Sequence, residues 1–303
     1  MGFDLQDVTR VPLGGAFVRV RDTTDLFDRL RDLRPDVAVI ESPCSEHPAH
    51  IELTLDAGVH CVITDKMLAE ETEAAVTVAE SLRQRPGGAS VGVYDHYLHL
   101  NSLLLLRAAH WVGEVRSIRA EFYETGGVGP DQVRSHRRGM MNFLHHAAAL
   151  PTTFGVRDLR PVAAVFARHP EAAVTDTYRA FRAEACNGRS VLTAAVGKCM
   201  PRDKKTIHIV GSRGSAMIDR RHNRMLVKTR DGRVFVIRQV ASDSGYGPLA
   251  LAIVNHRMPP NILTPDEAVS VMQLMDDAHR RATELSAYPT SESGTLAHTL
   301  IGC

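Results

Sequence analysis

The sequence predicts an α/β protein in which a parallel sheet with flanking helices is followed by an α+β domain with a mostly antiparallel open sheet. Two short apolar runs, 37–40 and 61–63, enclose a helical pattern, which is typical of a strand–helix–strand crossover. A third apolar run follows at 91–94, and from 118 onward short alternating runs predict an antiparallel sheet. The 303-residue length favours two domains, which we place at 1–95 and 96–303.

Composition excludes several classes of partner. The formal charge is +1 and no long run of one sign occurs, so nothing suggests binding to nucleic acid or to an anionic membrane surface. No apolar segment approaches the length of a membrane span, and the first residues do not form a signal peptide. The cysteines are odd in number and lack C-x-x-C spacing, which favours reduced thiols and a cytoplasmic location. They are Cys44, Cys61, Cys186, Cys199 and Cys303.

The stretch 36–66 carries the most information. Its first strand is followed by Ser42-Pro43-Cys44, and its helix ends at Gly58, the usual position of a glycine after a helix. Its second strand ends at Thr64-Asp65-Lys66. Ligands of open α/β sheets bind at the carboxyl ends of the strands, so we expect the chemistry there.

The remaining elements follow from periodicity and end signals. Before the crossover we expect a short strand at 17–20 and a helix capped by Thr24. After it we expect a helix at 70–83, a strand at 91–94, a helix ending at Gly113, a strand at 118–123 with one buried face, and a helix from about 140. Strands are expected near 161–168, 178–186, 189–197, 205–210 and 224–238, the last containing the hairpin signal Asp231-Gly232. Thr264 opens a capping box and a helix to about Arg281.

Four pieces of the sequence, in order and spacing, resemble the Gfo/Idh/MocA oxidoreductases, the family of glucose–fructose oxidoreductase and inositol dehydrogenase. Its members read T-P-x-x-x-H, then A-G-x-H, then E-K-P; here Ser42-Pro43, His47, 57–60 and 65–67 stand at these places. The resemblance extends to about residue 285. It implies a Rossmann-like domain, a second open-sheet domain, NAD or NADP as cofactor, a sugar, cyclitol or related polyol as substrate, and a homodimer or homotetramer.

One expected motif is absent. A dinucleotide-binding fold should open with a strand and G-x-G-x-x-G, whose backbone amides hold the pyrophosphate, and no such motif occurs in this sequence. Relative to the family, the first strand and the glycine loop are missing. Three explanations are open: the start codon is misassigned, dinucleotide binding has been lost, or a shortened fold holds the cofactor differently. A cofactor-free ligand-binding or partner protein, and an enzyme of redox-neutral chemistry, therefore stay open.

Oxidation of a secondary alcohol needs a base for the hydroxyl proton and a positive group near the oxygen. By resemblance, Lys66 matches the family's catalytic lysine, and Asn142 and His146 match a D-x-x-x-H pair with asparagine in place of aspartate. Four residues apart on a helix, Asn142 and His146 share a face. We expect His146 to act as base or acid, Lys66 to polarise the oxygen and Asn142 to contact substrate, whereas the adjacent His145 points elsewhere. The plain alternatives are a surface lysine and a structural histidine.

The resemblance also implies a cofactor side and further substrate contacts. Ser42, Pro43 and His47 would line the nicotinamide side, with Asp65 near the nicotinamide ribose and Lys66 beside it. Met67 replaces the family's proline, which removes a constraint on Lys66. Residues that could contact substrate, each also explicable as structural, are His96, Tyr123 and Arg134. Fifteen histidines raise the question of a metal site, but no H-E-x-x-H or zinc-type Cys/His spacing occurs, so no metal is expected.

Overall fold

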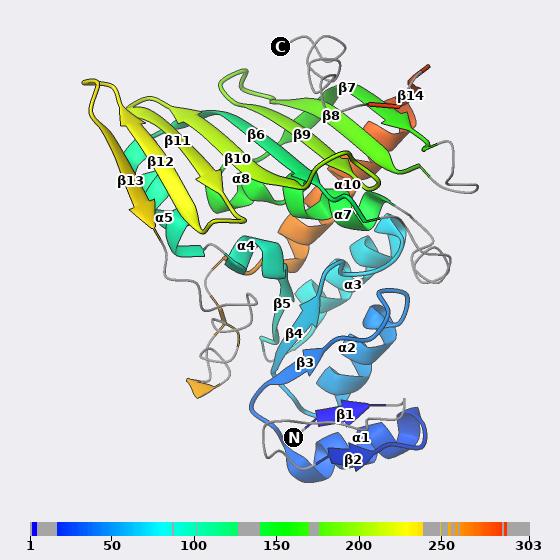
Figure 1. Ribbon diagram of the computed structural model, residues 1–303. Coiled ribbons are helices and arrows are strands. Elements are labelled where there is room, and N and C mark those ends of the chain that lie inside the picture. Colours follow the sequence, from blue (N-terminus) through cyan, green and yellow to red (C-terminus); the bar gives the residue numbers. More distant parts are fainter. Residues whose placement is uncertain are drawn as a thin grey trace.

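The computed structural model describes residues 2–4, 17–86, 88–100, 102–126, 140–169, 176–238, 249, 254–255, 258–259, 261–286 and 288–289. A broad sheet carries helices on one face, and a small parallel sheet with its own helices lies below it and contains the N-terminal part of the chain (Figure 1). The predicted α/β fold with two sheet units is confirmed.

The parallel sheet is the predicted crossover extended by one strand. Strands β3 (Ala38–Ile40), β4 (Cys61–Asp65) and β5 (Ser90–Tyr94) pair in that order, and α2 (His47–Asp56) and α3 (Thr72–Gln84) connect them. Ile40 and Val62 are buried in one core with Ile51 of α2. The apolar run 37–40 is typical of a strand that is buried on both faces of a parallel sheet, but Val39 is 38% exposed, so this pattern fails at the outer face of β3.

The N-terminal strands pair with each other rather than with this sheet, whereas the helix that follows them packs against α2. Strands β1 (Gly2–Asp4) and β2 (Phe17–Arg19) form a separate parallel pair, and α1 (Thr23–Leu33) follows. Asp22, rather than Thr24, caps α1: its side chain accepts a hydrogen bond of 2.9 Å from the backbone N–H of Asp25. Aspartate is at least as good an N-cap as threonine, and Asp22 stands two positions before Thr24.

The large sheet has nine strands among the described residues, in the order β13-β12-β11-β10-β6-β9-β8-β7-β14. It is antiparallel except for the pairs β6–β9 and β7–β14. Its strands are β6 (Val115–Tyr123), β7 (Leu159–Ala167), β8 (Tyr178–Ala185), β9 (Val191–Gly197), β10 (Lys204–Gly211), β11 (Gly214–Asp219), β12 (Arg224–Thr229), β13 (Val234–Arg238) and β14 (Thr283–Glu284). The predicted hairpin is present between β12 and β13, and Gly232 supplies its positive φ of 88°.

Helices cover one face of this sheet (Figure 1). They are α4 (His96–Leu100), α5 (Ser102–Val112), α7 (Met140–Ala148), α8 (Leu150–Thr153) and α10 (Pro265–Arg281). Ile118, Ala120 and Phe122 of β6 point into the core beneath them, as predicted. The other face of β6 is also buried near its end, because Tyr123 packs in a second cluster with Tyr178, so the expectation of a single buried face was wrong there.

The last helix ties the two sheets together. The capping box at Thr264 is confirmed, and α10 packs against both β7 and α3. Arg83 of α3 forms a 3.2 Å ion pair with Asp266, and Leu263 forms an antiparallel bridge with Val93 of β5. The domain division after residue 95 stays a prediction, because the chain leaves the parallel sheet there but returns to it at α10. Among the described residues, no helix is long and apolar enough to cross a membrane.

Candidate functional site

The site forms where β4 and β5 end side by side. Asp65 and Tyr94 are paired in the register of these strands, so the residues that follow them, Lys66 and Asp95, emerge at the same edge. The Lys66 N–H donates to the Tyr94 carbonyl at 3.2 Å. The carboxyl end of a parallel sheet is the expected ligand position, and two chemistry-bearing segments meet there.

Lys66 reaches across to α7. Its Nζ donates to Asn142 Oδ1 at 2.6 Å, and both side chains are half-buried. The peptide between Lys66 and Met67 is cis, and Met67 is buried at 2% exposure. The two residues assigned by resemblance to polarise and to contact substrate are thus in direct contact.

Asp95 joins both histidines of α7. His146 Nδ1 donates to Asp95 Oδ1 at 2.7 Å, and His145 Nδ1 donates to Asp95 Oδ2 at 3.0 Å. The backbone N–H of Tyr97 adds a third donor to Oδ1 at 2.9 Å. Because a carboxylate only accepts, the Nδ1 proton of His146 is fixed and its Nε2 carries the lone pair. The expectation that His145 points elsewhere was wrong, since it shares the carboxylate.

Burial and charge set the protonation of this group. Burial raises the pKa of Asp95, but His146 and His145 outweigh it and hold the pKa well below the ordinary range. Burial lowers the pKa of His146 well below its usual value; Asp95 opposes this effect and Lys66 adds to it. The site therefore holds an ionised Asp95 beside a neutral His146 at neutral pH.

Aromatic and imidazole rings enclose His146. Tyr97 stacks on it with ring centroids 3.9 Å apart and an interplanar angle of 16°. His96, at the start of α4, meets it edge-on at 5.1 Å, and Phe143 lies at 6.0 Å. Burial lowers the pKa of His96, with Asp95 opposing. These rings limit the motion of the imidazole.

The residues predicted on the cofactor side divide into two kinds. Pro43 is exposed, and the Ser42 hydroxyl lies 2.8 Å from His50 Nδ1. Asp65 is half-buried at the end of β4, and burial raises its pKa despite Lys66 beside it. These three stand around the strand ends, where a ligand can reach them.

His47 is a brace. It is 1% exposed, with Nδ1 2.6 Å from the Met67 carbonyl and Nε2 2.7 Å from the Ser42 carbonyl. The ring thus lies between two backbone oxygens of the β3 and β4 end loops; a neutral imidazole donates to one of them, and only the imidazolium form donates to both. Burial lowers its pKa, and the two carbonyls oppose this. The expectation that His47 faces a nicotinamide is replaced by this bracing role.

One predicted substrate contact, Tyr123, is not brought to the site. Tyr123 lies on the opposite face of the sheet from α7, where it packs on Tyr178 and lies 3.4 Å from Glu121. The alternation of β6 explains this, because its neighbour Phe122 takes the face toward α7. Arg134 falls outside the described residues.

Asp95, His96 and His146 have potential metal-ligand atoms within 4.8 Å of one another. Both Asp95 oxygens, however, already accept hydrogen bonds, and the His146 nitrogen nearest to Asp95 is a donor in one of them. A metal would have to displace these bonds, so the donor set fits a proton-transfer group better than a cation site.

Asp95 is a candidate site residue that the sequence analysis did not select. It follows the buried strand 91–94 directly, which is the same strand-end placement that drew attention to Lys66. Applying that rule to both strands would have found it.

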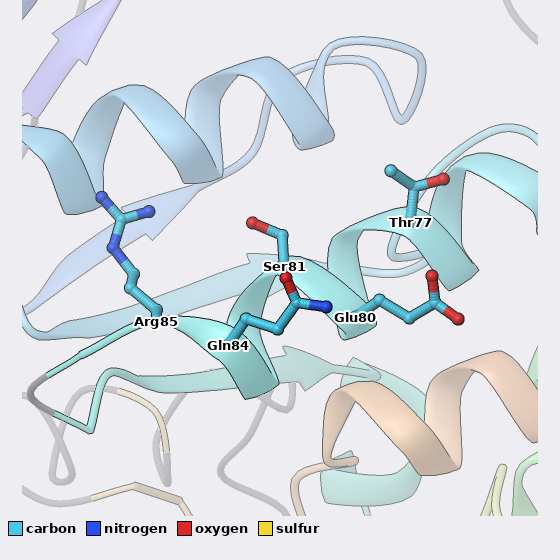
Figure 2. A pocket seen from close by; sticks show the side chains of 5 residues that line it. All are labelled: Thr77, Glu80, Ser81, Gln84 and Arg85. Carbon is cyan, nitrogen blue, oxygen red and sulfur yellow. The ribbon is translucent and has the colours of Figure 1, made fainter.

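A separate hollow of about 380 Å³ lies on α3 (Figure 2). It is lined by Thr77, Glu80, Ser81, Gln84 and Arg85. Arg85 is committed to ion pairs with Glu52 and Asp56, and Ser81 donates to Glu52 at 2.7 Å. None of these five lining residues belongs to the strand-end site.

Comparison with known proteins addresses the fold. No protein-family model and no curated protein sequence matches the chain. Among solved structures, the chain is similar to UDP-N-acetylglucosamine 3-dehydrogenase from Acidithiobacillus ferrooxidans, with 20% identity over 88% of this chain and 83% of that one and a TM-score of 0.68.

Two further structures show the same likeness. Levoglucosan dehydrogenase in complex with NADH and levoglucosan is 15% identical over 87% of this chain and 81% of its own, with a TM-score of 0.69. A variant of a 3-ketoreductase from Actinomadura kijaniata, in complex with TDP-benzene and NADP, is 18% identical over 84% and 79%, with a TM-score of 0.61. The chain therefore has the Rossmann-like two-domain fold of these oxidoreductases, the fold that its motifs imply by resemblance.

Proposed function

We propose that this protein is an NAD(P)-dependent oxidoreductase that moves a hydride between nicotinamide and a carbon of a sugar, cyclitol or related polyol. The observation that carries the proposal is the Asp95–His146 pair beside the Lys66–Asn142 pair at the carboxyl ends of β4 and β5. The likeness to solved sugar dehydrogenases and a ketoreductase supports it through the fold.

The residues present fit the nicotinamide end of such a cofactor. Ser42, Pro43, Asp65 and Lys66 surround the ends of β3 and β4 and would hold it there. When bound, the nicotinamide supplies the hydride acceptor or donor. The half-buried Asp65 beside the Lys66 ammonium provides polar groups at the position that the resemblance assigns to the nicotinamide ribose.

Four residues of the chain would carry out the proton transfer and stabilise the charge on the substrate oxygen. His146, held neutral by burial and with Nδ1 fixed on Asp95, presents Nε2 to take the hydroxyl proton. The imidazolium that forms is stabilised by Asp95 at 2.7 Å, so Asp95 is a positioning residue. The Lys66 ammonium stabilises negative charge developing on the substrate oxygen, and Asn142 Oδ1 fixes its direction.

A cofactor-free ligand-binding protein is the second candidate, and it is favoured by Asn142 and Met67, which stand where the family has aspartate and proline. Binding of NADH and NADPH to the full chain, measured by calorimetry and by the fluorescence of the reduced nicotinamide, separates the two. Trp111 is a poor reporter, because it packs on Phe235 at the β13 edge of the sheet. Micromolar binding is expected, and no binding at millimolar concentration of either cofactor would overturn the oxidoreductase proposal.

Lys66→Ala tests the mechanism. We expect turnover of a sugar or cyclitol substrate to be abolished even at saturating cofactor concentration, while thermal stability is retained, because the ammonium acts on the substrate oxygen and is not part of the apolar core. An unchanged rate would remove Lys66 from the mechanism. Lys204→Ala, on the opposite face of the large sheet, is the matched control.

A further inference from the structure

Four neighbouring strands of the large sheet place charged residues at one end and on one face. Lys198 follows β9, Glu124 follows β6, Lys205 is the second residue of β10, and Arg220 follows β11. These strands are adjacent in the order β11-β10-β6-β9. We call these four residues the charged row.

Contacts link the row along its length. Glu124 accepts from Lys205 at 2.9 Å through one oxygen and from Lys198 through the other. The Arg220 backbone N–H donates to the Lys205 carbonyl at 2.9 Å. One carboxylate is thus shared between two ammonium groups, which leaves the row with more positive than negative charge.

The row faces the catalytic residues. Lys205 Nζ lies 3.0 Å from the Tyr97 hydroxyl, and the Arg220 guanidinium lies over the Tyr97 ring at 4.2 Å. Tyr97 is the residue that stacks on His146. Lys198 lies 5.2 Å from the centre of the Phe143 ring, which also contacts His146. One layer of aromatic rings therefore separates the row from the proposed base.

The row keeps hydrogen-bond donors for a ligand. An ammonium group has three N–H donors. Among the contacts found in the described part of the chain, Lys198 uses one donor, on Glu124, and Lys205 uses two, on Glu124 and Tyr97. Arg220 is only 3% exposed, and burial lowers its pKa to about 10 against the effects of Tyr97 and Asp95, so an added anion would stabilise its charge.

We propose that the substrate carries an oxyanion, a carboxylate or a phosphate, which binds the charged row while the reacting carbon lies at Lys66 and His146. This inference rests on the proposed oxidoreductase function. In this proposal Lys198 and Lys205 donate hydrogen bonds to the oxyanion, and the buried positive charge of Arg220 adds to the attraction. These residues take no part in the proton transfer at His146.

The opposite face of the same strands supplies a matched control. Lys204 opposes Tyr123 in the β10–β6 register, whereas Lys205 opposes Phe122, so the two lysines project to different faces. Lys204 forms a 2.7 Å ion pair with Glu121 and its side chain is 31% exposed, against 27% for Lys205. The two lysines thus match in exposure and pairing and differ in the face they serve.

The experiment compares D-glucuronate, D-glucose 6-phosphate and D-glucose as substrates, with NAD and with NADP, for the unaltered protein and for Lys205→Gln and Lys204→Gln. We expect kcat/KM to favour an anionic sugar, and Lys205→Gln to lower the ratio of anionic to neutral kcat/KM about tenfold, as loss of one charged hydrogen bond implies. Lys204→Gln should leave that ratio unchanged. Equal use of glucose, or equal effects of the two variants, would overturn the inference.

Binding without turnover keeps the test independent of the redox proposal. If no sugar is oxidised, calorimetry of the full chain with D-glucuronate and with D-glucose 6-phosphate measures the row directly. Binding that Lys205→Gln weakens and Lys204→Gln preserves supports the row although the oxidoreductase proposal then fails. If neither anion binds, the inference is overturned. If one binds more tightly than the other, that preference shows whether the row recognises phosphate or carboxylate.

Discussion

Replacing Asp95 by asparagine tests the positioning of His146 at a single atom. The carboxylate is fully buried and accepts from His146, His145 and the Tyr97 backbone N–H. Asparagine keeps the shape but carries no charge, and its NH2 group cannot accept from an imidazole N–H. The imidazolium that forms during oxidation therefore loses its charged partner at 2.7 Å.

The magnitude follows from that one bond. A hydrogen bond to a charged group contributes about 1.5–3 kcal/mol. With about 1.4 kcal/mol for each factor of ten in rate, kcat should fall between about tenfold and about 150-fold. Because Asp95 raises the pKa of His146, its loss should also move the acid limb of the pH–rate profile to lower pH.

The assay is kcat and its pH profile, with cofactor affinity and melting temperature measured in parallel. Glu121→Gln is the control, because Glu121 is a buried carboxylate on the opposite face of the sheet, paired with Lys204 and Arg119 and not with His146. If Asp95→Asn kept both kcat and the position of the acid limb, Asp95 would have no part in catalysis.

Three further outcomes are expected. His47→Leu removes the ring that lies between the carbonyls of Ser42 and Met67 and leaves at least one of them without its donor, so urea unfolding should show a loss of about 1–3 kcal/mol; an unchanged midpoint would contradict the bracing role. The pKa values of His47 and His146 are lowered in the folded protein, so the unfolded chain binds these protons more tightly and the free energy of unfolding should fall as pH drops below about 6.5. Melting temperatures measured from pH 7 toward about pH 5 check this, and His146→Gln should make the melting temperature less dependent on pH. A melting temperature that rises toward low pH would contradict the prediction. Dialysis against EDTA should leave turnover unchanged, because both Asp95 oxygens are engaged, and a loss restored by Zn²⁺ would show a metal site.

Local patterns predicted much of the fold. The crossover at 36–66 was found because its apolar runs, helix stop and strand-end polar residues lie within one short stretch. The capping box at Thr264 was found for the same reason, since its bonds join residues three apart. Strand β11, with Ser215 and Ala216, lacks the β-branched run that predicts a strand and forms because β10 and β12 pair with it on both sides.

The site was only partly predictable, because its contacts join residues far apart in sequence. Lys66 and His146 could be named from strand-end placement and resemblance. Their hydrogen bonds could not be predicted, since the bond from Lys66 to Asn142 and the bond from His146 to Asp95 depend on how α7 lies across the sheet edge. Tyr123 was misplaced because alternation fixes which residues share a face without fixing which face meets α7.

The return of α10 to the parallel sheet has a consequence for synthesis of the chain. The bridge between Val93 and Leu263 and the ion pair between Arg83 and Asp266 are made by residues that leave the ribosome far apart in time. Until α10 emerges, the apolar side of α3 that it covers stays open to water, and the long loop between them must close before these contacts form. Nascent chains that stop before residue 264 should therefore expose this apolar surface and need chaperones.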